Sequence, residues 1–228
     1  MKNGFKALDS DMHVYDPPDL YLNYMSKKWG ERVPRGEWPK GHGRVEFRLG
    51  DGTVLRPRTE RIQSGEEKVA KHHTEGPNRG YDPVSQVEAM EREGLDVAVL
   101  FRTSPLYADD GFEPEYAAAL CRAWNSWIAD FCKHDPVKLK SSAVIPMHDV
   151  DVAVNEIRRA VKELGALGLS IGPEPVRGRQ IHDRYFDPLW AEAQDLGIET
   201  LGARRVRGEV AVGADDPPAG GRHDVQGA

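Results

Sequence analysis

The alternation of short apolar strands with helices from residue 82 onward most constrains the fold of this chain. Asp82 is a suitable N-cap, Pro83 suits the first helical position, and Gly94 suits a helix end. Chains in which short strands alternate with helices form parallel sheets whose strands are joined by crossover helices. Two architectures fit, an open doubly wound sheet and a (β/α)8 barrel. Helices are predicted over residues 82–94, 113–134, 149–164 (or 151–164) and 187–196. Strands are predicted over residues 6–13, 96–101, 139–146, 167–171 and 197–201.

The first predicted strand ends with a carboxylate and an imidazole. Side chains alternate between the two faces of a strand, so Asp11 and His13 point the same way. Both groups are good ligands for zinc or manganese. Two ligands do not complete a catalytic site, and the spacing alone favours the alternative that His13 is a hydrogen-bonded histidine at a strand end, with Asp11 as a cap. No glycine-rich nucleotide motif follows this strand, which favours the barrel, whose active sites lie at the carboxyl ends of the strands.

Composition excludes several classes of protein. The chain has 228 residues and a net charge of −6 at pH 7, which argues against a nucleic-acid-binding protein. Cys121 and Cys132 lie in one predicted helix, too far apart to form a disulfide. No signal peptide begins the chain, and no apolar run is long enough for a membrane span. We therefore expect a cytoplasmic protein with no membrane or nucleic-acid partner.

Two segments depart from the regular pattern. Residues 21–81 are rich in Gly, Pro and charged residues and are predicted to be an insertion after the first strand, either a functional cap or a disordered loop. Within this segment, residues 45–49 and 53–55 are predicted to form a hairpin. Residues 202–228 contain no Leu, Ile or aromatic residue, so we expect a disordered tail that follows a domain of residues 1–201.

Residues 7–20, with the sequence ALDSDMHVYDPPDL, resemble the start of the amidohydrolase-related family that includes aminocarboxymuconate-semialdehyde decarboxylase. Residues 82–101, 144–168 and 181–197 also resemble that family, in the same order and spacing. The resemblance implies a metal-dependent (β/α)8 barrel that hydrolyses or decarboxylates small, often aromatic, carboxylic acids. It assigns Asp11 and His13 to the first metal-ligand pair, with zinc or manganese as the cofactor. The metal would activate a water molecule or hold and polarise the substrate carboxylate.

The sequence also departs from the family pattern. A histidine expected after the strand at residues 197–201 is absent, and an aspartate expected after an eighth strand has no position. We therefore expect a truncated or frameshifted member with about five strands of the barrel. An unclosed sheet has two edges, which predicts low solubility or self-association. Two alternatives to an active enzyme are a non-catalytic remnant and a subunit that completes its sheet with a partner.

Two further residues are candidates for substrate binding. Arg102 follows the second strand of the barrel and could bind a substrate carboxylate through two hydrogen bonds, although a solvent-facing arginine explains it equally well. His148 follows the next strand and could replace a missing ligand or carry protons. A loop histidine bonded to the backbone is the alternative for His148.

Overall fold

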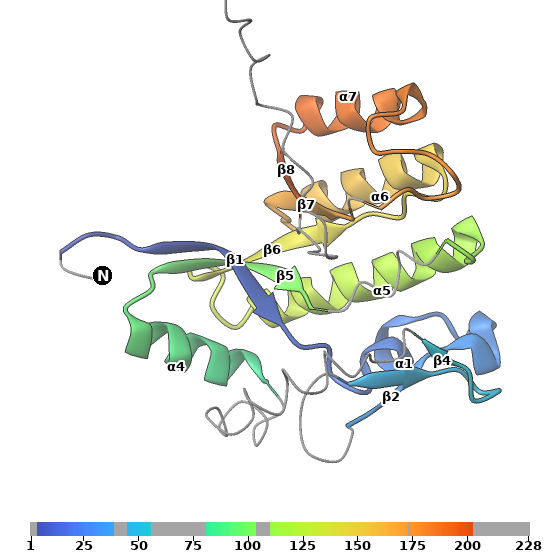
Figure 1. The fold of residues 1–228 in the computed structure, drawn as a ribbon. Helices are drawn as coiled ribbons and strands as arrows, with labels where there is room; N and C mark the ends of the chain where they lie inside the picture. The colour runs from blue at the N-terminus through green and yellow to red at the C-terminus, as the bar shows by residue number, and fades with distance from the viewer. Residues whose placement is uncertain (1–3, 39–44, 56–80, 104–109, 173, 203–228) are drawn as a thin grey trace, which may run out of the picture.

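The computed structural model describes residues 4–38, 45–55, 81–103, 110–172 and 174–202. Its main feature is a five-stranded parallel sheet in the order β1-β5-β6-β7-β8, with helices packed around it (Figure 1). The predicted partial (β/α)8 barrel is therefore confirmed. The strands are β1 (Leu8–Val14), β5 (Val97–Arg102), β6 (Leu139–Val144), β7 (Gly168–Ile171) and β8 (Glu199–Gly202). The connecting helices are α4 (Pro83–Glu93), α5 (Pro114–Cys132), α6 (Val150–Lys162), and α7 (Asp187–Asp195), which follows the short helix η3 (Arg184–Phe186).

The helix ends follow the signals in the sequence. The Asp82 carboxylate accepts a hydrogen bond from the Ser85 amide at 2.6 Å, and α4 ends at Gly94 with a φ of 75°. This left-handed conformation is easy for glycine and closes the helix. Asp149 accepts a hydrogen bond from the Val152 amide at 3.0 Å. Asp149, rather than Asp151, is therefore the cap of α6.

Two buried apolar clusters support the sheet. The first lies between α5, the β1 and β5 strands and the segment that follows β1, and the second surrounds α6 and α7. The predicted apolar stripe on α5 lies wholly in the first cluster. Its members are Tyr116, Leu120, Trp124, Trp127 and Phe131.

The described part of the predicted insertion packs against the barrel. It contains α1 (Leu20–Tyr24), η1 (Lys27–Arg32) and a small antiparallel sheet of β2 (Arg35–Glu37), β3 (Glu46–Arg48) and β4 (Val54–Leu55). The β3–β4 pairing, with Phe47 opposite Leu55, confirms the predicted hairpin. Residues 56–80 and 203–228 lie outside the described residues, so the choice between cap and loop and the disordered tail stay predictions.

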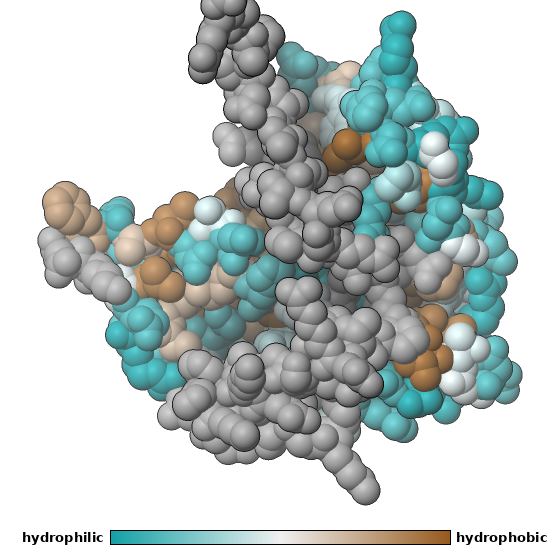
Figure 2. All heavy atoms as spheres, viewed as in Figure 1, coloured by the Kyte–Doolittle hydropathy of each residue, from teal (hydrophilic) through white to brown (hydrophobic). Residues whose placement is uncertain are grey.

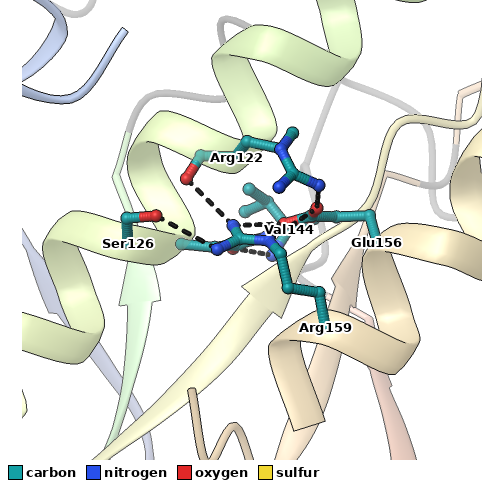
Figure 3. A network of polar contacts seen from close by, with 6 residues as sticks. Arg122, Ser126, Val144, Glu156 and Arg159 are labelled. Carbon is teal, nitrogen blue, oxygen red and sulfur yellow. Dashed lines mark hydrogen bonds and ion pairs between the residues drawn. The ribbon is translucent and has the colours of Figure 1, made fainter. Parts of the chain in front are cut away.

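A buried polar network fixes the carboxyl end of β6 to the helices (Figure 3). Glu156 of α6 is 1% exposed, and its carboxylate accepts hydrogen bonds from Arg122, Arg159 and Asn125 at 3.0, 2.8 and 2.8 Å. The Asn125 amide also donates to the Val144 carbonyl at 3.0 Å and accepts from the Val144 amide at 2.9 Å. Since each buried polar group has a partner, this network adds rigidity at the strand end without an uncompensated charge.

The two edges of the barrel sheet bear on the predicted self-association. Within the described residues, β1 pairs only with β5 and β8 only with β7. Leu8 at the start of β1 is 62% exposed, and apolar side chains gather near that point, at the left of Figure 2. Self-association stays a prediction. No described helix has the length and apolar character that crossing a membrane requires.

The two cysteines give a direct test of the packing of α5. Cys121 and Cys132 are both buried and unbonded. Burial raises the pKa of the Cys132 thiol to about 12 and raises that of Cys121 well above its ordinary value. We expect neither thiol to react with a disulfide reagent at pH 8 in the native protein, and both to react after denaturation. Rapid labelling of the native chain would contradict this packing.

Candidate active site

The carboxyl end of β1 presents different side chains to the two sides of the sheet. Met12 and Val14 pack in the first apolar cluster, and Asp16 accepts a hydrogen bond from Trp124 in the same cluster at 2.9 Å. His13 alternates with Met12 and Val14 and therefore lies on the other face, and the Asp11 carboxylate lies 3.8 Å from its Nε2. The sequence predicts this shared face, and the structure places the two side chains on it.

A β-bulge lies between Asp9 and Met12 and includes Asp11. Asp9 pairs with Ala98 and Met12 with Leu100, so β1 has one residue more than β5 across this interval. The Asp11 amide donates a hydrogen bond to the Asp9 carboxylate at 2.9 Å, which supports the bulge locally. Bulges are common at barrel rims and next to active sites, where they change the direction of a side chain.

The side chains of Asp11 and His13 approach each other closely enough to share an ion. His13 Nε2 lies 3.8 Å from Asp11 Oδ1, and the side chains are 47% and 73% exposed. A tetrahedral ion at about 2.1 Å from each of two donors separates these donors by about 3.4 Å. A small side-chain rotation therefore brings both atoms to ligand distance, and a nitrogen–oxygen donor set suits zinc or manganese.

A hydrogen bond orients the His13 ring. His13 Nδ1 lies 3.2 Å from the carbonyl oxygen of Arg102, the last residue of β5. Because a carbonyl only accepts hydrogen bonds, the neutral ring carries its proton on Nδ1, and the lone pair is on Nε2. Metal-binding histidines commonly use this arrangement, in which a backbone carbonyl holds the other ring nitrogen. The geometry therefore fits the ligand role of His13.

The described residues supply an incomplete ligand set. Within the described residues, no three side chains of His, Cys, Asp or Glu are close enough together to hold a metal ion. A catalytic zinc ion uses about three protein ligands. Asp11 and His13 therefore fit part of a metal site, and no described residue completes it.

Arg102 is buried rather than exposed, so the solvent-facing alternative is wrong. Its side chain is 1% exposed and donates to Asp16 Oδ2 from Nη2 at 3.0 Å and from Nε at 3.2 Å. The same guanidinium also donates to the Tyr21 hydroxyl. Burial raises the pKa of the Asp16 carboxyl, and the positive charge of Arg102 acts in the opposite direction. The carboxylate that Arg102 binds here belongs to the chain itself, and its role toward a substrate stays a prediction.

His148 is buried in the segment between β6 and α6 and is 3% exposed. It does not join Asp11 and His13 in a metal-binding group among the described residues. The structure therefore gives no support for His148 as a replacement ligand, and its proposed part in proton transfer or substrate binding stays a prediction.

Comparison with known proteins shows the family. The profile of the amidohydrolase family matches residues 9–199, which is most of the chain. The chain belongs to the amidohydrolase family. This result confirms the resemblance that the sequence indicates.

Several relatives of this amidohydrolase are decarboxylases. It is 28% identical over 117 residues to 2-amino-3-carboxymuconate-6-semialdehyde decarboxylase from Dictyostelium discoideum, covering 51% of this chain and 32% of that protein. It is 27% identical over 121 residues to gamma-resorcylate decarboxylase from Polaromonas, covering 50% of this chain and 36% of the relative. The matched region thus spans about a third of the length of these relatives.

Solved structures show the same fold at low sequence identity. An amidohydrolase from Mycobacterium avium subsp. paratuberculosis superimposes with a TM-score of 0.64 and 19% identity, over 87% of this chain and 59% of that one. The 5-carboxyvanillate decarboxylase from Novosphingobium aromaticivorans, solved with manganese and 3-methoxy-4-hydroxy-5-nitrobenzoic acid, gives a TM-score of 0.56 and 20% identity. That match covers 86% of this chain and 50% of the other.

Proposed function

We propose that this chain carries part of a metal-dependent decarboxylase that acts on small aromatic carboxylic acids. The observation that carries the proposal is the Asp11–His13 pair at the end of β1, with Nδ1 of His13 held by a backbone carbonyl. The names of the relatives favour decarboxylation over hydrolysis, since they include gamma-resorcylate and 5-carboxyvanillate decarboxylases.

The proposed metal is manganese, which the 5-carboxyvanillate decarboxylase structure contains. A bound divalent ion would hold the substrate carboxylate and stabilise negative charge as carbon dioxide leaves. His13 contributes its Nε2 lone pair and Asp11 its carboxylate, while the Arg102 carbonyl keeps the imidazole in the ligand tautomer. The overall reaction breaks the bond between the ring and the carboxylate carbon, and a proton takes the place of carbon dioxide on the ring.

The proposed partner is a small carboxylate, and the proposed compartment is the cytoplasm. Self-association through the edge strands β1 and β8 belongs to the same proposal, because an open barrel leaves these edges without a strand partner among the described residues. Asp11 and His13 form only part of a ligand set among the described residues, so residues outside the described ranges are proposed to supply further ligands. A non-catalytic remnant and a sheet-completing subunit are the competing outcomes.

The experiment measures carbon dioxide release from 2,6-dihydroxybenzoate labelled in the carboxyl group. The full chain is incubated with manganese, with zinc, or with a chelator. Release that requires manganese and stops with the chelator is the expected result. Stoichiometric manganese binding without release of label would contradict the activity and favour a remnant. Release only after addition of a second polypeptide would favour the sheet-completing alternative.

A further inference from the structure

An aromatic row begins beside the Asp11–His13 pair. The rings of Tyr15 and Tyr81 have centroids 4.4 Å apart and planes inclined by 31°, and Tyr81 lies 5.9 Å from Trp38 at 36°. We infer that Tyr15, Tyr81 and Trp38 form a surface on which the aromatic ring of the substrate stacks. This inference rests on the proposed function and assigns its ring-binding residues.

The geometry of this row differs from that of the packed core. The other described aromatic pairs that do not involve His13 cross at 61° to 90°, as in Tyr21–Phe47 at 80° and Phe112–Tyr116 at 90°. Edge-to-face pairs fill a core, whereas rings tilted by 31° and 36° are closer to the offset-stacked arrangement, which a further ring can extend. The row therefore has the geometry of a ring-binding surface.

The row also lies on the correct side of the sheet. Tyr15 is two residues beyond His13, and the intervening and following residues, Val14 and Asp16, are both buried on the core side. Alternation places Tyr15 on the face of His13, at about 7 Å along an extended chain. One small ligand can span this distance, with its carboxylate near the ligand pair and its ring on Tyr15.

Trp38 comes from a different part of the chain. It directly follows β2, and Figure 1 shows the carboxyl end of β1 running toward the small sheet that contains β2. Its surface is 40% exposed. The described part of the insertion thus contributes Trp38 to the inferred surface.

The three residues lie outside the main core of the described chain. None of them belongs to either apolar cluster of the described chain. Tyr81 has a φ of 55°, in the left-handed region that residues with a side chain rarely adopt. Such strained residues concentrate at functional sites, where the surrounding structure holds them in place.

The test compares two carboxylates that differ only in their rings. Benzoate and cyclohexanecarboxylate are titrated by calorimetry into the manganese-loaded full chain and its Tyr15→Leu variant. We expect Tyr15→Leu to weaken benzoate binding about 5-fold and to leave cyclohexanecarboxylate binding unchanged, because only the flat ring loses a stacking partner. Tyr15→Phe, which keeps the ring, should bind benzoate as the wild type does.

Tyr24→Leu is the matched control, since Tyr24 lies on α1 and donates to Asp130 at 2.9 Å. It should leave both affinities unchanged. Tyr81→Leu is a second variant with the same expectation as Tyr15→Leu, and helps if the latter folds poorly. Unchanged benzoate affinity in both leucine variants, or an equal loss for both probes, would overturn the inference.

The outcomes separate this inference from the proposed function. Carbon dioxide release with an unchanged KM in Tyr15→Leu would overturn the stacking surface and leave the decarboxylase standing. Benzoate binding that depends on Tyr15 without any release of carbon dioxide would support the surface and contradict the activity. A wild-type chain that binds neither benzoate nor another aromatic carboxylate would overturn the stacking surface.

Discussion

Arg102→Met is expected to lower the free energy of unfolding by about 3–5 kcal/mol, because it leaves a buried carboxylate without its cation. The side chains of Arg102 and Asp16 are 1% and 3% exposed, so water cannot replace the lost partner. Trp124 retains its hydrogen bond to Asp16 but carries no charge. Urea denaturation followed by tryptophan fluorescence measures the change.

The loss should depend on pH in a defined direction. Burial raises the pKa of Asp16 in the folded state, and the positive charge of Arg102 opposes that rise. Removing Arg102 therefore raises the folded pKa further above the unfolded value. At a pH between the unfolded and the folded pKa of Asp16, this carboxyl is ionised in the unfolded chain but still protonated in the folded one. The variant therefore loses stability as the pH rises through this range. The difference from the wild type should be smaller near pH 4 than near pH 8.

Two further variants test whether the loss of stability in Arg102→Met comes from the unpaired buried carboxylate. Arg184→Met removes an arginine whose pair with Asp187 is 95% and 57% exposed, and it should leave stability nearly unchanged. Asp16→Leu combined with Arg102→Met should cost less than Arg102→Met alone, since no buried charge then remains. Equal losses for Arg102→Met and Arg184→Met would show that burial of the pair is unimportant.

Local signals in the sequence were sufficient to predict the helices and strands. Asp82, Pro83 and Gly94 lie at the two ends of α4 and define its limits, and the apolar spacing of α5 predicts which of its faces is buried. Strand alternation also predicts the shared face of Asp11 and His13, and their side chains lie together although the bulge between Asp9 and Met12 interrupts the regular pairing. These features need no knowledge of distant contacts.

The missed features depend on contacts between residues far apart in the sequence. Asp16 looks like part of a strand-ending Asp-Pro-Pro turn, yet it binds Arg102 86 residues away. Tyr15 meets Tyr81 in the same way. The bulge was missed for a different reason, because one additional residue in β1 changes pairing with β5 and leaves no trace in the apolar pattern.

The second large effect concerns the metal. His13→Ala is expected to weaken manganese binding by at least about 100-fold and to abolish metal-dependent release of carbon dioxide. Changing a group that only supports a ligand typically costs 10- to 100-fold in affinity, so losing the ligand itself costs at least as much. Asp11→Asn keeps the size of the side chain but removes its charge, and it should weaken binding less than His13→Ala. Electron paramagnetic resonance of free manganese measures both affinities.

His182→Ala supplies the matched control, because His182 is an exposed histidine just before η3 and belongs to no candidate ligand group. It should bind manganese as tightly as the wild type. The Arg102 carbonyl adds a further expectation, since it holds His13 Nδ1. Arg102→Met, studied where it is still folded, should weaken manganese binding by disturbing the orientation of the ring. Full manganese affinity in His13→Ala would remove the Asp11–His13 pair from the metal site, and with it the observation on which the proposed decarboxylase depends.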